Sequence, residues 1–252
     1  MNNINLLIDK FNNIKNMGWI PSIKKGSAGI GLTFEHLIGV NENEFEIPDF
    51  NGIELKTKRS NSNSYTTLFN ATPDGPHFHE VERLRTTYGY PHSKAKEYKV
   101  LNVSTFVNQL NNMGIKYYSK LKLDYNNQKL FLLIYDRNKE LIENEVFWYF
   151  DTLKEKLLRK LNVLAYINAD TKIVNNTECF KYYKMTIYVL KDFNTFLNLL
   201  EQGIIRVTFK INVNLSGPRK GQICDHGTGF DIQEKDLLKL YNYYLENEQD
   251  LK

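Results

Sequence analysis

The stretch PDFNGIELKTKR, residues 48–59, gathers acids and bases around one short apolar segment. Ile53 and Leu55 alternate there with charged residues, and this period of two is typical of a half-buried strand. Glu54 and Lys56 lie two positions apart, so they point to the same side of the strand. The pattern therefore predicts a strand with an apolar face in the core and an acid–lysine pair on the other face.

Asp49 comes directly before this strand and can fold back towards the face of Glu54. Two converging carboxylates suit a hard divalent cation such as Mg²⁺, which prefers oxygen ligands and keeps several waters. Such a cation polarises a phosphoryl oxygen, and Lys56 beside an attacking water would orient it. The pattern predicts phosphodiester hydrolysis. The alternative is an ordinary solvated strand edge, because an aspartate followed by Glu-x-Lys also arises by chance.

Two neighbouring features favour the hydrolytic interpretation. Glu35 lies on an expected helix just upstream, where it could supply a third carboxylate. The glycine-rich loop KKGSAGIG (24–31) and the end of the strand add positive charge where a phosphate backbone would lie. The predicted phosphate contacts are Lys24, Lys25, Lys58 and Arg59; the alternative for each is a solvated charge.

The composition bounds the class of protein. At 252 residues, 42% hydrophobic and 25% charged, the chain can bury one large core or two packed lobes. A formal net charge of +4 leans towards a polyanionic partner. Cys179 and Cys224 form no metal-binding pattern, so we expect free thiols. With no secretion signal and no membrane-spanning stretch recognised, we expect a cytoplasmic protein.

The remaining elements follow from periodicity and turn residues. We expect helices at 4–14, 32–39, 146–161 and 193–203 (capped by Asp192), and a last helix ending near residue 247. We expect strands at 53–58, 64–72 (as its hairpin partner), 163–168, 180–190 and 204–215, a strand–turn–strand unit at 115–136, and a long loop at 72–91. The fold class is α/β or mixed α+β, with a mixed central sheet.

The stretches GSAGIGLTFEHLIG (26–39) and PDFNGIELKTKRSNSNS (48–64) closely resemble the MvaI/BcnI family of Type II restriction endonucleases. More distantly they resemble the mismatch-repair nicking endonuclease MutH. Both belong to the PD-(D/E)xK nuclease superfamily, whose signature Pro48-Asp49 and Glu54-Leu55-Lys56 match. Glu35 matches the helical glutamate of this branch, and DHGTGFDI (225–232) resembles a C-terminal turn of the family.

The resemblance implies a restriction-endonuclease-like core that forms a two-lobed clamp and acts as a monomer on duplex DNA. Asp49 and Glu54 would bind Mg²⁺, Lys56 would position the attacking water, and Glu35 would support the metal or a water. The catalytic lobe would span roughly 18–160. The recognition lobe would span roughly 161–252 together with the N-terminal helix. Relatives cut short CCNGG-type sites.

Base reading is expected from the C-terminal stretch, because arginine or lysine facing guanine is the commonest specific contact. The strand 204–215 carries Arg206 and Lys210, and the basic turn 216–232 carries Arg219, Lys220, Asp225 and His226. The alternatives are a solvated strand face for Arg206 and Lys210 and a turn cap for Asp225.

The segment PHFHE (76–80) has two histidines and a glutamate but no further ligand at a familiar spacing, so it is a poor metal site. His77 or His79 could contact DNA from the expected loop. The alternative is an ordinary hydrogen-bonded histidine.

The leading hypothesis is a Mg²⁺-dependent, site-specific endonuclease of a restriction system, paired with a DNA methyltransferase that protects the host and forms no stable complex with it. The rivals are a MutH-like nicking endonuclease that needs partner proteins, and a non-catalytic DNA-binding protein on the same fold. The intact acid–acid–lysine set argues against the latter.

Overall fold

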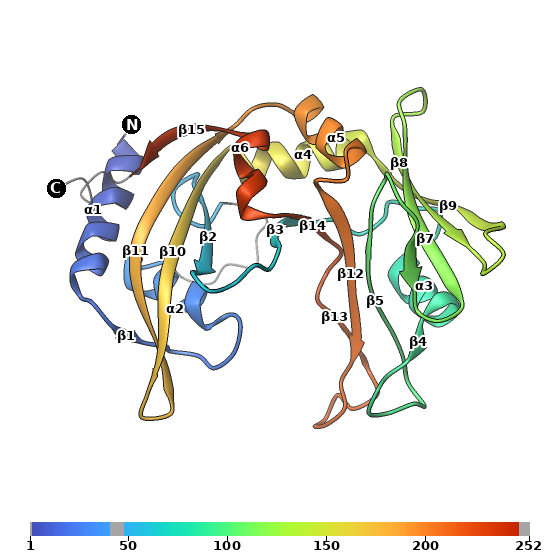
Figure 1. Ribbon diagram of the computed structural model, residues 1–252, viewed down its shortest axis with the longest axis horizontal. Helices are drawn as coiled ribbons and strands as arrows, with labels where there is room; N and C mark the ends of the chain where they lie inside the picture. The colour runs from blue at the N-terminus through green and yellow to red at the C-terminus, as the bar shows by residue number, and fades with distance from the viewer. Residues whose placement is uncertain (1, 41–47, 247–252) are drawn as a thin grey trace. The chain divides into compact units, whose positions relative to one another are not determined.

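A computed structural model describes residues 2–40 and 48–246 (Figure 1). The helices in these ranges are α1 (Asn2–Asn16), α2 (Gly29–Ile38), α3 (Glu80–Tyr88), α4 (Phe150–Leu161), α5 (Phe193–Glu201) and α6 (Leu237–Leu240), with a 3₁₀ turn at Glu234–Asp236. The strands are β1 (Ile20–Pro21), β2 (Glu54–Arg59), β3 (Thr66–Asn70), β4 (Tyr90–Pro91), β5 (Lys99–Thr105), β6 (Asn111–Met113), β7 (Tyr117–Asp124), β8 (Lys129–Tyr135), β9 (Leu141–Tyr149), β10 (Val163–Val174), β11 (Thr177–Leu190), β12 (Arg206–Val213), β13 (Ile223–Asp225), β14 (Gly229–Ile232) and β15 (Tyr241–Glu246).

The chain divides into two compact units. The first unit comprises residues 1–64, 158–191 and 238–252, and the second comprises 65–157 and 192–237. These boundaries differ from the predicted division near residue 160. The reason is strand pairing: β2 needs β10 as its neighbour, so the hairpin of β10 and β11 belongs with the N-terminal segment.

The first unit is built on a mixed five-stranded sheet in which β1, β11, β10 and β2 are successive neighbours and β15 pairs with β11. The long hairpin of β10 and β11 turns at Asn175 and Asn176, both at positive φ, as a tight two-residue hairpin turn requires. β2 runs parallel to β10, with Glu54 opposite Leu164. The predicted mixed central sheet is confirmed.

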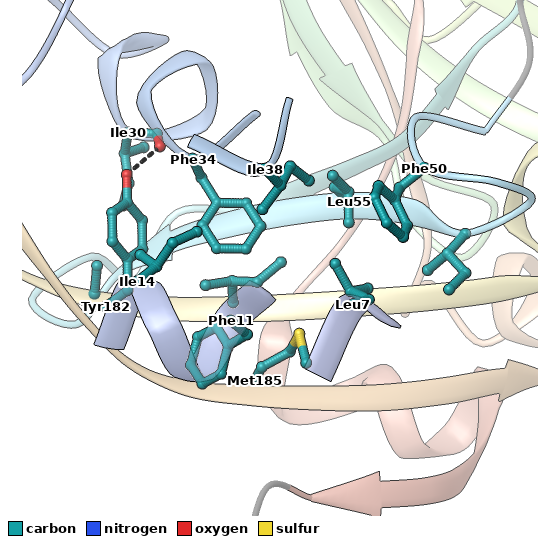
Figure 2. Packing of buried hydrophobic residues seen from close by; sticks show 14 of the residues in the cluster. Leu7, Phe11, Ile14, Ile30, Phe34, Ile38, Phe50, Leu55, Tyr182 and Met185 are labelled. Atoms are coloured by element: carbon teal, nitrogen blue, oxygen red, sulfur yellow. Dashed lines mark hydrogen bonds between the residues drawn. The ribbon is translucent and has the colours of Figure 1, made fainter. Parts of the chain in front are cut away.

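The core of the first unit lies between this sheet and helices α1 and α2 (Figure 2). Leu7, Phe11 and Ile14 recur at helical spacing and are all buried, as predicted for α1. α2 ends at Gly39, whose φ of 79° is the left-handed conformation that terminates helices. The Tyr182 hydroxyl donates to the Ile30 carbonyl at 2.7 Å and so ties β11 to α2.

The second unit contains a six-stranded sheet, in which β3, β14, β12, β5 and β4 are successive neighbours and β13 also pairs with β12, and a four-stranded sheet of β6 to β9. An aromatic core fills this unit. Phe230 stacks on Phe69 with ring centroids 4.9 Å apart and meets Trp148 edge to face at 6.0 Å. The Trp148 indole nitrogen donates to the Ala71 carbonyl at 2.9 Å, so the buried ring leaves no polar group unpaired.

Two predictions for the middle of the chain are wrong. The stretch 64–72 does form a strand, but β3 pairs with β14 rather than with β2. The expected loop 72–91 contains helix α3, which buries Glu80, Leu84 and Tyr88 on one side. These three buried residues are four positions apart, which is typical of a helix, but the prolines and glycines around them had indicated a loop.

Two predicted helices also differ. The helix expected at 146–161 begins only at Phe150, because the preceding residues continue β9 with buried Val146 and Trp148 alternating with more exposed neighbours. The last expected helix is the short α6, followed by β15, and its predicted end at residue 247 lies outside the described residues. Pairing with β11 outweighs the local helical pattern there.

Cys179 and Cys224 are free, as predicted. No helix within the described ranges combines the length and apolar character needed to cross a bilayer.

Candidate active site

A two-residue turn folds Asp49 back onto β2. Phe50 and Ile53 exchange backbone hydrogen bonds of 2.9 and 2.8 Å across Asn51 and Gly52. Both turn residues have positive φ, 45° and 90°, and Asn-Gly is the dipeptide that accepts this geometry most readily. Asp49 thereby reaches past the turn, and its Oδ2 accepts the backbone N–H of Leu55 at 3.0 Å.

The turn brings the predicted acid–acid–lysine set together. Lys56 Nζ donates to Glu54 Oε1 at 2.5 Å. Asp49 is held at the same strand through the Leu55 N–H, and its negative charge adds to the burial that raises the pKa of Glu54. Leu55 points into the core, whereas the Lys56 side chain remains 24% exposed. Glu54 and Lys56 share one side of the strand, as predicted, but the predicted half-buried strand is wrong, because Glu54 and Lys58 on the charged side are buried as well.

Glu54 is fully buried, and its environment contains a second lysine. Lys160, in the last turn of α4, places Nζ 3.5 Å from Glu54 Oε1. Burial raises the pKa of Glu54; Lys56 opposes this, Asp49 adds to it, and Lys160 opposes it. Burial also raises the pKa of Tyr241 on β15, with a contribution from the charge of Glu54. Lys160 was missed from sequence because only the parallel pairing of β2 with β10 brings the end of α4 to this carboxylate.

The residues present fit a magnesium ion. Glu54 Oε2 is buried and has no hydrogen-bond partner, so one acceptor of this carboxylate is unsatisfied. Within residues 2–40 and 48–246, no three His, Cys, Asp or Glu side chains gather into a group that could hold a metal ion by themselves. Mg²⁺ needs no such group, because it is commonly held by one or two carboxylates, waters and substrate phosphate oxygens.

The buried carboxylate predicts a pH-dependent stability. Because the pKa of Glu54 is raised in the folded state, its stabilising contribution is full below the ordinary value of 4.5 and is lost as pH rises through the folded-state pKa. We expect Glu54→Gln to unfold at a Tm about 2–4 °C higher than wild type at neutral pH in EDTA, a gain of about 1 kcal/mol. The gain should vanish in acid. Melting curves from pH 3.5 to 8 test this, with the exposed Glu97→Gln as control; a variant less stable than wild type at pH 7 would contradict it.

Glu35 lies half-buried on α2. A Cβ added to Gly31 would lie 3.6 Å from Glu35 Oε1 and 3.4 Å from Thr57 Oγ1, so α2 approaches β2 closely here. The Glu35 charge contributes to raising the pKa of Tyr182, after burial. Its support of a metal or a water stays a prediction.

The basic residues around the first unit differ in availability. Lys24 and Lys25 are exposed and fit phosphate contacts. Lys58 is buried and donates to the carbonyl and the hydroxyl of Ser64. Arg59 forms two bonds to Glu178 and reaches the carbonyls of the 24–31 loop. Both side chains hold the strand end and the glycine-rich loop in place, and their predicted phosphate contacts stay predictions.

Arg206 and Lys210 lie on the same face of β12, where residues alternate between half-buried and buried. Their side chains are 22% and 32% exposed. Both approach the buried carboxylate of Asp231, and Arg206 Cζ lies 3.5 Å from the centroid of the Tyr65 ring. The solvated-face alternative does not describe them, because each is held in a specific cluster.

The other predicted reading residues are exposed in the segment between β12 and β14, where Asp225 is the last residue of β13. Arg219 and Lys220 are open to solvent. Asp225 Oδ1 accepts the Gly227 N–H at 2.8 Å, which is the turn cap considered as its alternative role. His226 Nε2 lies 3.6 Å from Cys224 Sγ. Cys224 and His226 are thus close in space despite the lack of a metal-binding motif.

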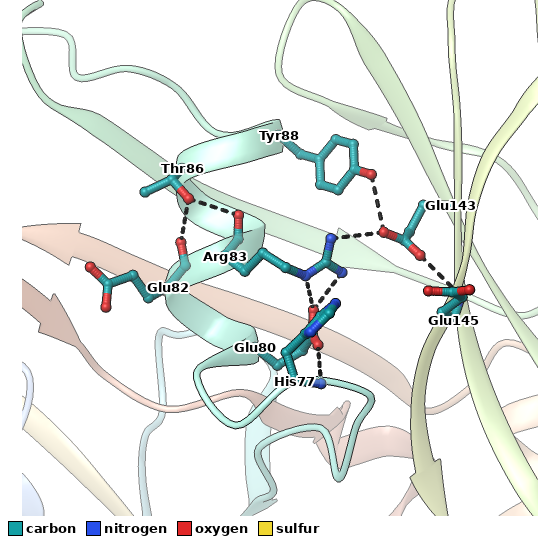
Figure 3. A network of polar contacts seen from close by, with 8 residues as sticks. All are labelled: His77, Glu80, Glu82, Arg83, Thr86, Tyr88, Glu143 and Glu145. Carbon is teal, nitrogen blue, oxygen red and sulfur yellow. Dashed lines mark hydrogen bonds and ion pairs between the residues drawn. The ribbon is translucent and has the colours of Figure 1, made fainter.

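His77 and His79 are exposed just before α3, where a polar network fixes the backbone (Figure 3). The His77 N–H donates to Glu80 Oε2 at 3.0 Å. Arg83 bridges Glu80 and Glu143, with Nη1 2.9 Å from Glu143 Oε2. Burial and the Glu143 charge raise the pKa of Tyr88 to about 12. The network leaves the His77 ring at the surface, so its DNA contact stays a prediction.

Comparisons with known proteins cover nearly the whole chain. The model of the MvaI/BcnI restriction endonuclease family matches residues 8–241. A solved structure described as the restriction endonuclease MvaI–cognate DNA substrate complex is 31% identical, with a TM-score of 0.90 over 97% of this chain and 98% of that chain. A structure of restriction endonuclease MvaI in the absence of DNA is also 31% identical, with a TM-score of 0.62 over 97% of both chains. No curated protein sequence matches.

The mixed sheets and these similarities define a restriction endonuclease, an enzyme that cuts DNA. The chain belongs to the MvaI/BcnI restriction endonuclease family.

Proposed function

We propose that this enzyme hydrolyses phosphodiester bonds of double-stranded DNA at a short, CCNGG-like site with Mg²⁺, and that it acts as a monomer. The observation that supports this is the convergence of Asp49, Glu54 and Lys56 on one end of β2, with one oxygen of Glu54 lacking a partner. Asp49 and Glu54 would hold the ion. Bound there, Mg²⁺ supplies a Lewis acid that neutralises charge developing on the scissile phosphate.

Lys56 positions the nucleophile in this proposal. An ammonium has three donors, so Lys56 can hold Glu54 Oε1 and an attacking water at once. The water oxygen forms a new bond to phosphorus as the bond to one sugar oxygen breaks; the attacking water releases one proton to solvent, and the departing oxygen takes up one proton from solvent. Lys56 also stabilises the negative charge that grows on the phosphorus oxygens. Glu35 would support the ion or the water from α2.

The biological setting belongs to the same proposal. The enzyme is cytoplasmic in this proposal, and its recognition site also occurs in the DNA of its host. The host therefore needs a cognate DNA methyltransferase that protects the same site and forms no stable complex with the enzyme. A methyltransferase gene found beside this one would support a restriction system.

The experiment is a plasmid digest with MgCl₂, with EDTA and without metal, followed by mapping of the cut ends. We expect discrete fragments with Mg²⁺, linear products cut in both strands, and no cleavage in EDTA. Nicked circles alone would support a nicking enzyme instead, and equal cleavage in EDTA would overturn the metal assignment.

Lys160 gives a prediction for the missed part of the site. Its charge at 3.5 Å helps hold Glu54 in place, so Lys160→Ala should lower the single-turnover cleavage rate about tenfold, or about 1.4 kcal/mol in activation free energy. The exposed Lys154→Ala on the same helix is the matched control and should cut at the wild-type rate. Equal rates for Lys160→Ala and wild type would remove Lys160 from the site.

A further inference from the structure

One row of side chains crosses three strands of the six-stranded sheet. Asp231 on β14 lies opposite Arg206 on β12 and opposite Thr67 on β3. Residues directly opposite in antiparallel strands point to the same face, so the three side chains meet. Asp231 Oδ1 accepts the Thr67 hydroxyl at 2.7 Å, and Asp231 Oδ2 lies 3.6 Å from Arg206 Nε.

A β-bulge produces this row. The pairing of β14 with β3 shifts register between Phe230 and Asp231, so Phe230 opposes Phe69 while Asp231 opposes Thr67. Bulges re-aim side chains and are common beside functional sites. Phe230 is thereby kept in the aromatic core, and the carboxylate of Asp231, only 2% exposed, is aimed at the two cations.

Gly229 leaves room for the second cation. A Cβ at this position would lie 2.8 Å from Asp231 Oδ1 and 2.9 Å from Lys210 Nζ. Because that space is open, Lys210 crosses from β12 to donate to Thr67 Oγ1 at 2.9 Å and to approach Asp231 Oδ1 at 3.6 Å. A side chain at 229, which lies opposite Thr208, would therefore displace the ends of the Asp231 and Lys210 side chains.

The cluster fixes two partly exposed cations around one buried anion. The guanidinium of Arg206 is held between Asp231 and the face of the Tyr65 ring, 3.5 Å from its centroid. A long side chain held in this way loses little conformational freedom when it binds, so its donors are pre-organised. The negative charge of Asp231 reduces the repulsion between the two cations, and the three charged groups together keep a net positive charge.

We propose that Asp231 is a positioning residue that holds Arg206 and Lys210 as a paired reader of guanine in duplex DNA. Arginine and lysine pair with the O6 and N7 acceptors of guanine, which require a donor at a defined place rather than a diffuse charge. The inference rests on the proposed site-specific function and deepens it: Asp231 touches no base, but it determines where the two reading side chains lie.

The experiment measures sequence preference rather than activity alone. A duplex library with a randomised central segment is cut by wild type and by Asp231→Asn, and the products are sequenced. Single-turnover rates follow on the preferred duplex and on duplexes with each G·C pair changed to A·T. We expect Asp231→Asn to lose about tenfold or more of the discrimination at one or two G·C positions. Rates on duplexes already altered at those positions should stay within about threefold of wild type.

Two further variants guard against a folding defect. Thr67→Val removes the hydroxyl between Asp231 and Lys210 with little change in volume, and it should weaken discrimination at the same positions by a smaller factor. Gly229→Ala should relax those positions too. Glu143→Gln is the matched control: it alters a carboxylate paired with an arginine in the same unit, away from this sheet face, and should keep the wild-type preference.

The outcomes are distinct. Relaxed preference at the same positions in the Asp231 and Thr67 variants supports the inference. A site-specific wild type whose Asp231→Asn variant keeps its preference, or loses rate equally on all duplexes, overturns it and leaves the proposed function standing. A wild type that cuts every duplex equally overturns the proposed function and the inference together.

Discussion

Lys56→Ala is expected to lower the single-turnover rate of DNA cleavage about 10³-fold, the loss typical of removing one donor to a developing anion. The side chain contacts Glu54 at 2.5 Å and remains partly exposed, so it can reach a water and the phosphate together. Glu54→Gln should lose at least as much, because a neutral amide cannot offer a charged ligand to the ion. Binding of duplex DNA should stay within about threefold of wild type for both, since phosphate contacts elsewhere dominate affinity.

The measurement is a quench-flow or manual time course with enzyme in excess, beside a fluorescence anisotropy titration of the same duplex. Lys181→Ala, an exposed strand lysine of the same unit, is the matched control and should cut normally. Adding MgCl₂ should raise the Tm of wild type but not that of Glu54→Gln, because a ligand stabilises only the state that binds it. Cleavage at the wild-type rate by either variant would show that the site is elsewhere.

Phe230→Ala is expected to destabilise the second unit by about 3–5 kcal/mol, or roughly 6–20 °C in Tm. The ring is fully buried and contacts Phe69, Phe196 and Trp148, so its removal leaves a cavity that the sheet cannot fill. Since Asp231 follows it directly, the same change should also loosen the cluster around Arg206.

Trp148 provides the readout for this loss. In a Trp19→Phe background the remaining indole reports the second unit alone, because the chain has two tryptophans. Urea unfolding followed by its emission should shift to lower midpoint in Phe230→Ala. Phe78→Ala is the control: the ring is 96% exposed and its loss should not move the midpoint. A loss below about 1 kcal/mol for Phe230→Ala would mean that the aromatic cluster repacks around the gap.

The raised pKa of Glu54 shows that burying this carboxylate lowers the stability of the folded protein at neutral pH. A buried carboxylate with an unpaired oxygen is unfavourable until something binds it, and two lysines only partly offset the burial. The first unit thus keeps a group that reduces stability at neutral pH. Such costs are common where a site is organised for a ligand.

Local sequence was sufficient for β2 and its turn. Alternation of Ile53 and Leu55 with Glu54 and Lys56 sets the faces of the strand, and Asn51-Gly52 sets the turn that returns Asp49. These features depend on neighbours a few residues away, where periodicity and backbone conformation decide the outcome. The helical spacing of α1 and the Asp192 cap of α5 were predictable for the same reason.

Long-range pairing decided the rest. No pattern in residues 64–72 predicts that β3 pairs with β14. Likewise, Tyr241–Glu246 forms a strand only because it pairs with the edge of β11. Lys160 pairs with Glu54, and Asp231 pairs with Arg206, and in each pair the two residues are more than twenty positions apart in the sequence. By itself, the sequence determined the chemistry of the acid–acid–lysine strand. The tertiary structure decided which distant charges surround that strand and which cations are held in fixed positions. The reason is that strand order is a property of the whole sheet rather than of any one segment.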